Sequence, residues 1–245
     1  KQRHIPVIIH ESDMTPGLAN RLCISSARNV CCNFPETLNY LPADKAVLTG
    51  SPIRRELLNG SVLSGLKFTG LSSEKPVILV IGGSLGSVKV NTAVRNILPA
   101  LLEKYQVIHL CGRGNLDKSL KSLKGYVQYE YISAQLKDLF AMSDMIISRA
   151  GANSICEILA LRKPNLLIPL SAAASRGDQI LNARSFQKQG FSEVLEEENL
   201  TDESLKEMIE KVFTHKYDYI NAMNRSKTSD AITIITRLIE DAANS

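Results

Sequence analysis

The sequence predicts an α/β fold in which parallel strands form a doubly wound sheet with helices on both faces. Short apolar runs rich in β-branched residues recur along the chain, as buried parallel strands require. A turn containing glycine or polar residues ends most of these runs, and a helical pattern follows it. Strands that alternate with helices in this way are joined by right-handed crossovers, which makes neighbouring strands parallel.

The first part of the chain predicts strands at residues 5–9, 29–32 and 46–49, a helix opened by Pro16, and a short helix at 54–58. Segment 59–74 carries Gly60, Gly65 and Gly70 but few long apolar runs, so we expect a linker there. The predicted domains are therefore residues 1–70 and residues 71–245.

From Lys75 onward the pattern becomes regular. Strands are expected at 77–81, 107–110, 127–129, 145–147, 165–168 and 192–195. Helices are expected at 90–102 (broken near its end by Pro99), 116–123, 136–142, 154–161, 178–188, 203–213, 217–223 and 230–242. Ligands of such sheets bind at the carboxyl ends of the strands, so the turns after these strands are the candidate site.

Composition excludes several classes of protein. The net charge is +4, from 29 Lys and Arg against 25 Asp and Glu, which is too weak a basic excess for a dedicated nucleic-acid binder. No apolar run approaches the ~20 residues that cross a bilayer. Five cysteines without a C-x-x-C pair and four histidines without metal-ligand spacing predict reduced thiols and no metal site.

Two turns carry features suited to phosphate. Gly82-Gly83-Ser84-Leu85-Gly86-Ser87 follows a predicted buried strand and opens a helix, whose N-terminus offers free N–H groups and partial positive charge. The spacing is neither the G-x-G-x-x-G of nicotinamide enzymes nor a P-loop, which disfavours both of those classes. A plain strand–helix turn remains an equal interpretation of these glycines.

The second turn, Ser148-Arg149-Ala150-Gly151-Ala152-Asn153, also joins a strand to a helix. Ser154-x-x-Glu157 fits a capping box, which would stabilise the helix by ~1 kcal/mol. Alternatively, the amides of residues 152–154 hold a diphosphate, and Glu157 accepts the hydroxyls of a ribose, because a carboxylate is a good bidentate acceptor. The sequence leaves both interpretations open.

Three other stretches place polar side chains at strand ends. Asp178 and Gln179 suit sugar hydroxyls, although Asp178 alone is better explained as an N-cap. Arg54 either reaches an anionic group or is a solvated helix residue. His10, in His10-Glu11-Ser12-Asp13, is more often structural at such a position.

The ordered set H-E-S-D-x-T-P-G-L-A-N, G-S-P-I-R, G-G-S-L-G-S, S-R-A-G-A-N-S-x-x-E and D-Q-x-x-N-A resembles the MurG family from about residue 5 to the C-terminus. Members of this family are glycosyltransferases that add N-acetylglucosamine to lipid I in peptidoglycan synthesis. The resemblance implies a GT-B fold of two Rossmann-like domains, with the complete C-terminal domain and part of the N-terminal domain present here.

Site residues follow from the same resemblance. Uracil would meet backbone groups of Ile132, and Arg54 and Ser84 would lie near the phosphates across the cleft. The diphosphate, ribose and N-acetylglucosamine would be bound by Ala152, Asn153, Ser154, Glu157, Asp178 and Gln179. His10, Glu11 and Asp13 would lie on the acceptor side, where Asp13 replaces a frequent Asn and loses a hydrogen-bond donor.

The family's G-G-T-G-G-H loop, whose His is a candidate catalytic base, does not occur in these residues. We therefore expect the base to lie outside this chain and the chain alone to transfer little or no sugar. The resemblance implies no cofactor, UDP-N-acetylglucosamine and undecaprenyl-linked lipid I as substrates, and no nucleic acid. It also implies a cytoplasmic protein, peripheral on the inner face of the cell membrane and docked through the missing N-terminal domain.

Two other functions are compatible with a nucleotide-sugar site. One is a donor-binding module that works with a separate acceptor subunit, against which residues 1–70 argue, because a donor half alone would not need them. The other is a UDP-N-acetylglucosamine 2-epimerase of the same fold, which would need catalytic carboxylates and histidines that the sequence does not present.

Overall fold

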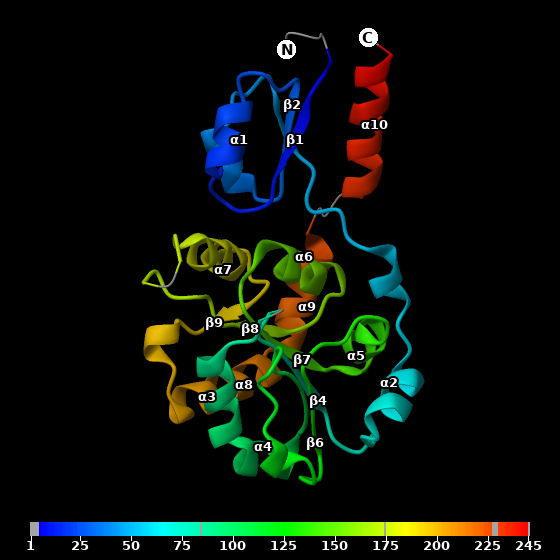
Figure 1. The fold of residues 1–245 in the computed structure, drawn as a ribbon, viewed down its shortest axis with the longest axis vertical. Helices are drawn as coiled ribbons and strands as arrows, with labels where there is room; N and C mark the ends of the chain where they lie inside the picture. Colours follow the sequence, from blue (N-terminus) through cyan, green and yellow to red (C-terminus); the bar gives the residue numbers. More distant parts are fainter. Residues whose placement is uncertain (1–4, 84, 174, 227–229, 245) are drawn as a thin grey trace.

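The structure, a computed structural model, describes residues 5–83, 85–173, 175–226 and 230–244. Its strands form two sheets in which every pairing is parallel (Figure 1). The small sheet has the order β1-β2-β3, and the large sheet has the order β6-β5-β4-β7-β8-β9. Helices cover the sheets, so the predicted α/β architecture with parallel sheets is confirmed.

The small sheet consists of β1 Ile8–Glu11, β2 Asn29–Cys32 and β3 Ala46–Leu48, with α1 Leu18–Cys23 and the 3-10 helices η1 Pro35–Tyr40 and η2 Arg55–Asn59 along the same stretch of chain. The strands of the large sheet are β4 Val77–Ile81, β5 Gln106–Leu110, β6 Tyr126–Tyr129, β7 Met145–Ser148, β8 Asn165–Leu167 and β9 Glu193–Val194. The remaining α-helices are α2 Val62–Thr69, α3 Val88–Asn96, α4 Leu98–Lys104, α5 Leu136–Met142, α6 Ala152–Ala160, α7 Asp178–Lys188, α8 Asp202–Thr214, α9 Lys216–Arg225 and α10 Ala231–Ala243. Two further 3-10 helices are η3 Lys118–Leu120 and η4 Glu197–Asn199.

The large sheet is buried on both faces. Ile78 and Val80 of β4 belong to one buried apolar cluster, whereas Val77 and Leu79 belong to the other. Alternate side chains of a strand point to opposite faces, so continuous apolar runs are what a sheet covered on both sides requires. This explains why the strands read as unbroken apolar segments in the sequence.

The order of the large sheet places its switch point between β4 and β7. The chain runs from β4 outward to β5 and β6, then returns to the other side of β4 to build β7, β8 and β9. The turns that leave β4 and β7 therefore diverge to opposite sides, and a crevice opens between them at the carboxyl ends of the strands. Those are the two turns that the sequence singled out.

The predicted linker at 59–74 is wrong in part, because it contains helix α2, which packs on α5. Its glycines have a packing role rather than a linker role. A Cβ atom on Gly60 would overlap with the carbonyl of Lys137, and one on Gly65 would lie 2.8 Å from the carbonyl oxygen of Asp138. Glycine therefore allows the backbone of segment 60–65 to lie close to that of α5. The need for glycine here comes from residues far away in the sequence.

Two predicted helices also differ in the structure. The expected helix at 90–102 is two helices, α3 and α4, which meet at Ile97, with Pro99 in the first turn of α4, where proline is tolerated. The expected helix at 116–123 is only the short η3. Its start is an Asx turn in which the Asp117 carboxylate accepts from the Ser119 amide at 3.0 Å, and such turns compete with an α-helix.

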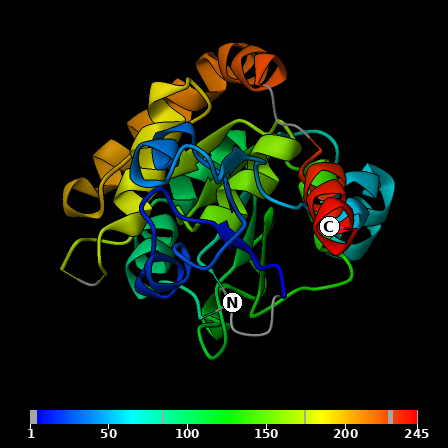
Figure 2. The same ribbon diagram turned by 90° about the horizontal axis from the view of Figure 1, so that it is seen from above.

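Helix α10 lies against the small sheet rather than the large one (Figures 1 and 2). A space of about 370 Å³ between them is lined by Ile8, Ile9, Ile235 and Ile239, among others.

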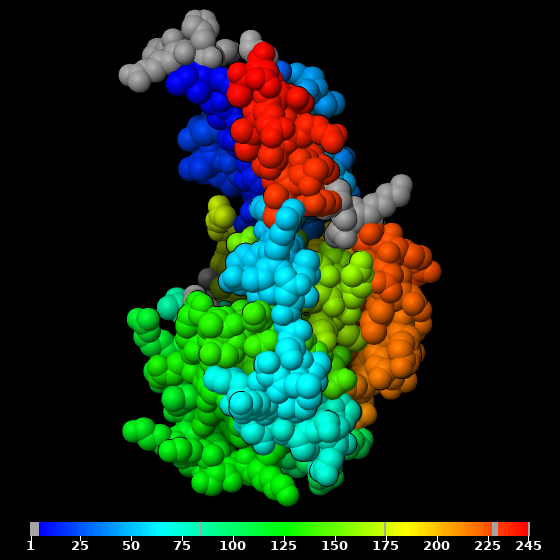
Figure 3. Space-filling view, turned by 90° about the vertical axis from the view of Figure 1, so that its right-hand side faces the viewer, coloured from blue at the N-terminus to red at the C-terminus, as the bar shows by residue number. Residues whose placement is uncertain are grey.

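Segment 51–70 connects the small sheet to the large one and runs along the surface toward α5 (Figure 3). The chain thus crosses between the two sheets twice, once at residues 51–70 and once before α10. The predicted division into domains at residue 70 stays a prediction.

A buried polar network supports the start of α3. The fully buried His109 imidazole contacts the Tyr126 hydroxyl at 3.0 Å and the Asn91 side-chain oxygen at 2.9 Å. Burial, and next the charge of Arg95, lower the pKa of His109 to about 3, so this ring is neutral at ordinary pH. Asn91 in turn donates to the Cys111 carbonyl at 2.9 Å, which ties α3 to the turn after β5.

Candidate functional site

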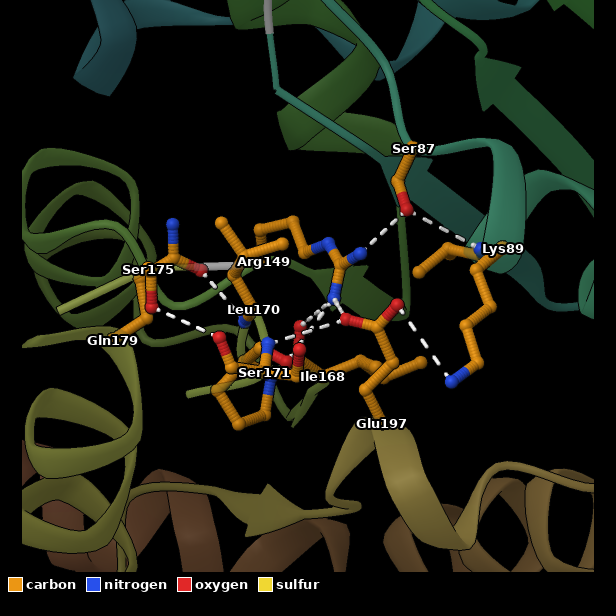
Figure 4. Close-up of polar contacts among 11 residues, drawn as sticks. Ser87, Lys89, Arg149, Ile168, Leu170, Ser171, Ser175, Gln179 and Glu197 are labelled. Carbon is orange, nitrogen blue, oxygen red and sulfur yellow. Dashed lines mark hydrogen bonds and ion pairs between the residues drawn. The ribbon is translucent and has the colours of Figure 1, made fainter. Parts of the chain in front are cut away.

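A pocket of about 420 Å³ lies at the switch point, between the turns after β4 and β7. Residues from the β4 turn, the β7 turn, the loop after β8 and the start of α7 line it, including Gly83, Ser87, Gly151, Ser154 and Gln179. Figure 4 shows the polar contacts that surround it. The location is the one that a doubly wound sheet predicts for a ligand.

Glycine is required in the β4 turn at two positions. Gly83 and Gly86 have φ angles of +86° and +75°, a region that favours glycine. A Cβ atom on Gly86 would also overlap with the Cys111 carbonyl, so this turn packs directly on the turn after β5. The predicted phosphate contact Ser84 lies outside the described residues.

The β7 turn leads into α6 without any side-chain cap. The N-cap residue is Gly151, and no side chain bonds to the first turn of the helix. The capping-box interpretation of Ser154 and Glu157 is therefore wrong, because Ser154 is the third residue of the helix and not its N-cap. Among the described residues, the amides of Ala152, Asn153 and Ser154 have no hydrogen-bond partner, which leaves three donors at a positive helix end.

Glu157 lies one turn further along α6 and is paired with Arg54. The Arg54 guanidinium donates to one carboxylate oxygen of Glu157 from Nη2 at 3.1 Å and from Nε at 3.3 Å. The Arg54 side chain is 51% exposed and that of Glu157 is 18% exposed. Both were predicted site residues, and the structure brings them together from segments 103 residues apart.

At the start of α7, the N-cap residue is Gly177, with φ +84°, so Asp178 is not the N-cap. Its carboxylate pairs with Arg176 at 2.9 Å and accepts from the Thr15 hydroxyl at 3.3 Å. Gln179 lines the pocket, where its side-chain oxygen accepts from the Leu170 amide at 3.0 Å. The side-chain oxygen of Gln179 is therefore engaged, whereas its NH₂ group has no hydrogen-bond partner among the described residues and can donate to a ligand.

The predicted acceptor-side residues take different places. Glu11 is buried, and its carboxylate accepts from the amides of Asp13 and Gly17 and from the Asn20 side chain, which orders the turn after β1. The His10 ring contacts the Gly50 carbonyl at 3.1 Å. These contacts organise the local backbone and leave few polar atoms of Glu11 for a ligand.

Asp13 contacts helix α7, which packs on the large sheet. Its carboxylate accepts from the Asn182 side chain of α7 at 2.9 Å, and Asn182 accepts in turn from the Met14 amide at 2.9 Å. The turn after β1 is thereby joined to helix α7. Ile132 follows β6, packs against the apolar cluster on one face of the large sheet, and does not line the 420 Å³ pocket.

Arg149, which was not among the predicted site residues, makes four hydrogen bonds at the pocket (Figure 4). Its guanidinium donates to the Ser87 hydroxyl at 2.6 Å, to the carbonyls of Ile168 and Pro169 at 3.1 Å each, and to Glu197 at 2.8 Å. An arginine directly after a buried strand, in a turn of small residues, was the available signal. Its partners lie far along the chain and could not be inferred.

Glu197 completes this cluster from beyond β9. Its burial raises the pKa of the carboxyl, but the hydrogen bond and charge of Arg149 and the Ser171 amide outweigh that effect, and the pKa is lowered overall. Lys89 lies 3.9 Å from the other carboxylate oxygen. The described residues contain no cluster of three or more His, Cys, Asp or Glu that could hold a metal ion, and no described helix is long and apolar enough to cross a membrane.

Comparison with known proteins places this geometry in a family. Residues 77–238 match the family described as glycosyltransferase family 28 C-terminal domain. UDP-N-acetylglucosamine--N-acetylmuramyl-(pentapeptide) pyrophosphoryl-undecaprenol N-acetylglucosamine transferases from Lachnoclostridium phytofermentans and Lachnospira eligens are 63% and 60% identical. Each match covers 98% of this chain and 68% of the relative.

The crystal structure of Acinetobacter baumannii MurG superposes with a TM-score of 0.72 at 23% identity, over 96% of this chain and 67% of that one. This likeness concerns the fold, and it confirms the predicted GT-B type. Because the family match spans more than half of the chain and the relatives are well above 30% identical over most of their length, the chain belongs to the MurG family of glycosyltransferases.

Proposed function

We propose that this chain binds UDP-N-acetylglucosamine and belongs to an enzyme that transfers its N-acetylglucosamine to lipid I, giving lipid II for peptidoglycan synthesis. The observation that carries the proposal is the uncapped start of α6, where Ser154 lines the pocket and three amides have no partner among the described residues, with a carboxylate one turn further along. The two relatives with 98% coverage carry the name of this activity.

In this proposal the diphosphate lies at the amides of Ala152, Asn153 and Ser154. The helix N-terminus supplies hydrogen-bond donors and partial positive charge to the phosphates as negative charge grows on the leaving UDP. No metal ion is then needed for that stabilisation. Ser84, which belongs to the glycine turn after β4, would also contact the phosphates.

The nucleoside and the sugar would lie on either side of the diphosphate. Glu157 would accept hydroxyls of the ribose, and the backbone at Ile132 would meet uracil. Asp178 and the free NH₂ group of Gln179 would contact the N-acetylglucosamine ring. Arg54, which now pairs with Glu157, would move to the phosphates when the ribose takes its place, since its exposed side chain can turn without loss of packing.

The acceptor hydroxyl would attack the anomeric carbon from the side of the small sheet, with inversion. His10 and Asp13 lie on that side, and no catalytic base is assigned within the chain. We place the protein in the cytoplasm at the inner face of the membrane, where lipid I is presented, with the membrane contact outside the described residues. Lipid II made there supports cell-wall growth, cell shape and division.

Isothermal titration calorimetry of the chain tests the proposal. We expect saturable binding of UDP-N-acetylglucosamine and of UDP, and at least about tenfold weaker binding of ADP-glucose, since a different base and sugar lose hydrogen bonds worth ~1.4 kcal/mol or more. Equal affinity for the uridine and adenosine ligands, or no binding of either, would contradict the proposal.

A further inference from the structure

We propose that Glu197 is a positioning residue for the donor pocket, which it orders by holding Arg149 and the loop after β8 in place. The inference rests on the proposed function, because it concerns the same pocket. Glu197 begins η4, after β9, and belongs to none of the glycine turns. Figure 4 shows its carboxylate reaching back toward the guanidinium of Arg149.

The two carboxylate oxygens of Glu197 have different environments. Oε2 accepts from Arg149 Nη1 at 2.8 Å and from the Ser171 amide at 3.3 Å. Within the described part of the chain, the partner of Oε1 is the Lys89 ammonium alone, at 3.9 Å and on a side chain that is 54% exposed. A single oxygen therefore makes both of the contacts that tie the pocket together.

Through Arg149 that oxygen connects three parts of the pocket wall. Arg149 itself comes from the β7 turn that leads to α6. Its Nη2 reaches Ser87, the N-cap of α3, and its Nη1 reaches the Ile168 and Pro169 carbonyls after β8. Without Glu197 the guanidinium would lose its one charged partner among the described residues, and its direction would depend on the hydrogen bonds to Ser87, Ile168 and Pro169 alone.

The loop after β8 is held from two sides. The Ser171 amide donates to Glu197, and the preceding amide, that of Leu170, donates to the side-chain oxygen of Gln179. Glu197 thereby also fixes the orientation of Gln179, whose NH₂ group is proposed to meet the sugar. Loss of the contact between Glu197 and the Ser171 amide would therefore make the position of the Gln179 NH₂ group less fixed.

If charge alone mattered, removal of the Glu197 carboxylate would strengthen binding of the anionic ligand rather than weaken it, because a carboxylate beside an anion site repels the ligand. The Glu197 charge is, however, already matched by Arg149 at 2.8 Å, and both side chains are about 10% exposed. The net charge of the pair is zero, so geometry should decide the outcome.

Two conservative variants separate geometry from charge. Glu197→Gln can place its oxygen where Oε2 lies and its NH₂ where Oε1 lies, which keeps both contacts and removes the charge. Glu197→Asp keeps the charge but is one methylene too short to reach both partners. Glu196→Ala is the matched control, because Glu196 forms an equally short ion pair, with Arg184 at 2.8 Å, outside the pocket.

The measurement is UDP-N-acetylglucosamine affinity by calorimetry, with the melting temperature of each variant recorded. We expect Kd to rise about tenfold in Glu197→Ala and Glu197→Asp, and by less than about threefold in Glu197→Gln and Glu196→Ala. The inference is overturned if Glu197→Gln is as weak as Glu197→Ala, if the variants bind more tightly, or if only melting temperatures change. Absence of binding by the unmodified chain would instead refute the proposed function.

Discussion

Replacing Glu157 with glutamine is expected to weaken UDP binding by about tenfold or more, since a hydrogen bond to a charged group contributes about 1.5–3 kcal/mol. The melting temperature should change little. Glu157 does not cap α6, and Arg54, its one ion-pair partner among the described residues, is half exposed, so the pair itself contributes at most about 1 kcal/mol. Calorimetry of the variant with UDP measures the first effect, and thermal unfolding measures the second.

Glu56→Gln is the control for this substitution. Glu56 also pairs with Arg54, at 3.6 Å, but its side chain is 68% exposed and it is not a proposed contact of UDP. Loss of an Arg54 partner is thus common to both variants, and only Glu157→Gln removes the proposed ribose acceptor. Equal UDP affinity in the two variants would show that Glu157 does not contact the ribose.

Gly86→Ala is expected to have the largest effect on stability of any single substitution considered. Alanine at φ +75° costs about 1–2 kcal/mol, and its Cβ would overlap with the backbone carbonyl of Cys111, which cannot turn away as a flexible side chain could. Together these effects should lower the free energy of unfolding by about 3–5 kcal/mol, at the upper end for point substitutions. Urea denaturation measures the loss.

Gly83→Ala in the same turn isolates the contribution of the overlap. Gly83 has φ +86°, but a Cβ atom there meets no heavy atom within 4 Å. Its variant should therefore lose only the backbone cost of about 1–2 kcal/mol. Similar losses in both variants would mean that the β4 turn does not pack rigidly against the turn after β5.

The fold could be predicted from the sequence because its signals are local. The apolar run of β4 and the glycine turn after it specify a buried parallel strand that ends at a ligand-binding edge. The linker prediction was wrong because contacts distant in the sequence decided there, whereas the helix expected at 116–123 was prevented by a local Asx turn. Gly60 and Gly65 looked like linker residues because nothing local shows that α5 packs closely against them.

The same distinction applies to the site. Glu157 and the amides of residues 152–154 lie within the first two turns of one helix, so their closeness was evident from the sequence, and the structure excludes the capping box. The partnership of Glu157 with Arg54 joins segments 103 residues apart, and that of Arg149 with Glu197 spans 48 residues. No periodicity or spacing reports such pairs, so Arg149 and Glu197 were missed.

The central claim is that the diphosphate of UDP binds at the switch-point pocket and that its ribose displaces Arg54 from Glu157. A crystal structure of the chain with UDP tests it most directly. We predict phosphate oxygens within hydrogen-bond distance of the amides of residues 152–154, ribose hydroxyls on the Glu157 carboxylate, and Arg54 released from Glu157. UDP bound elsewhere, or bound while Arg54 and Glu157 remain paired, would contradict the claim.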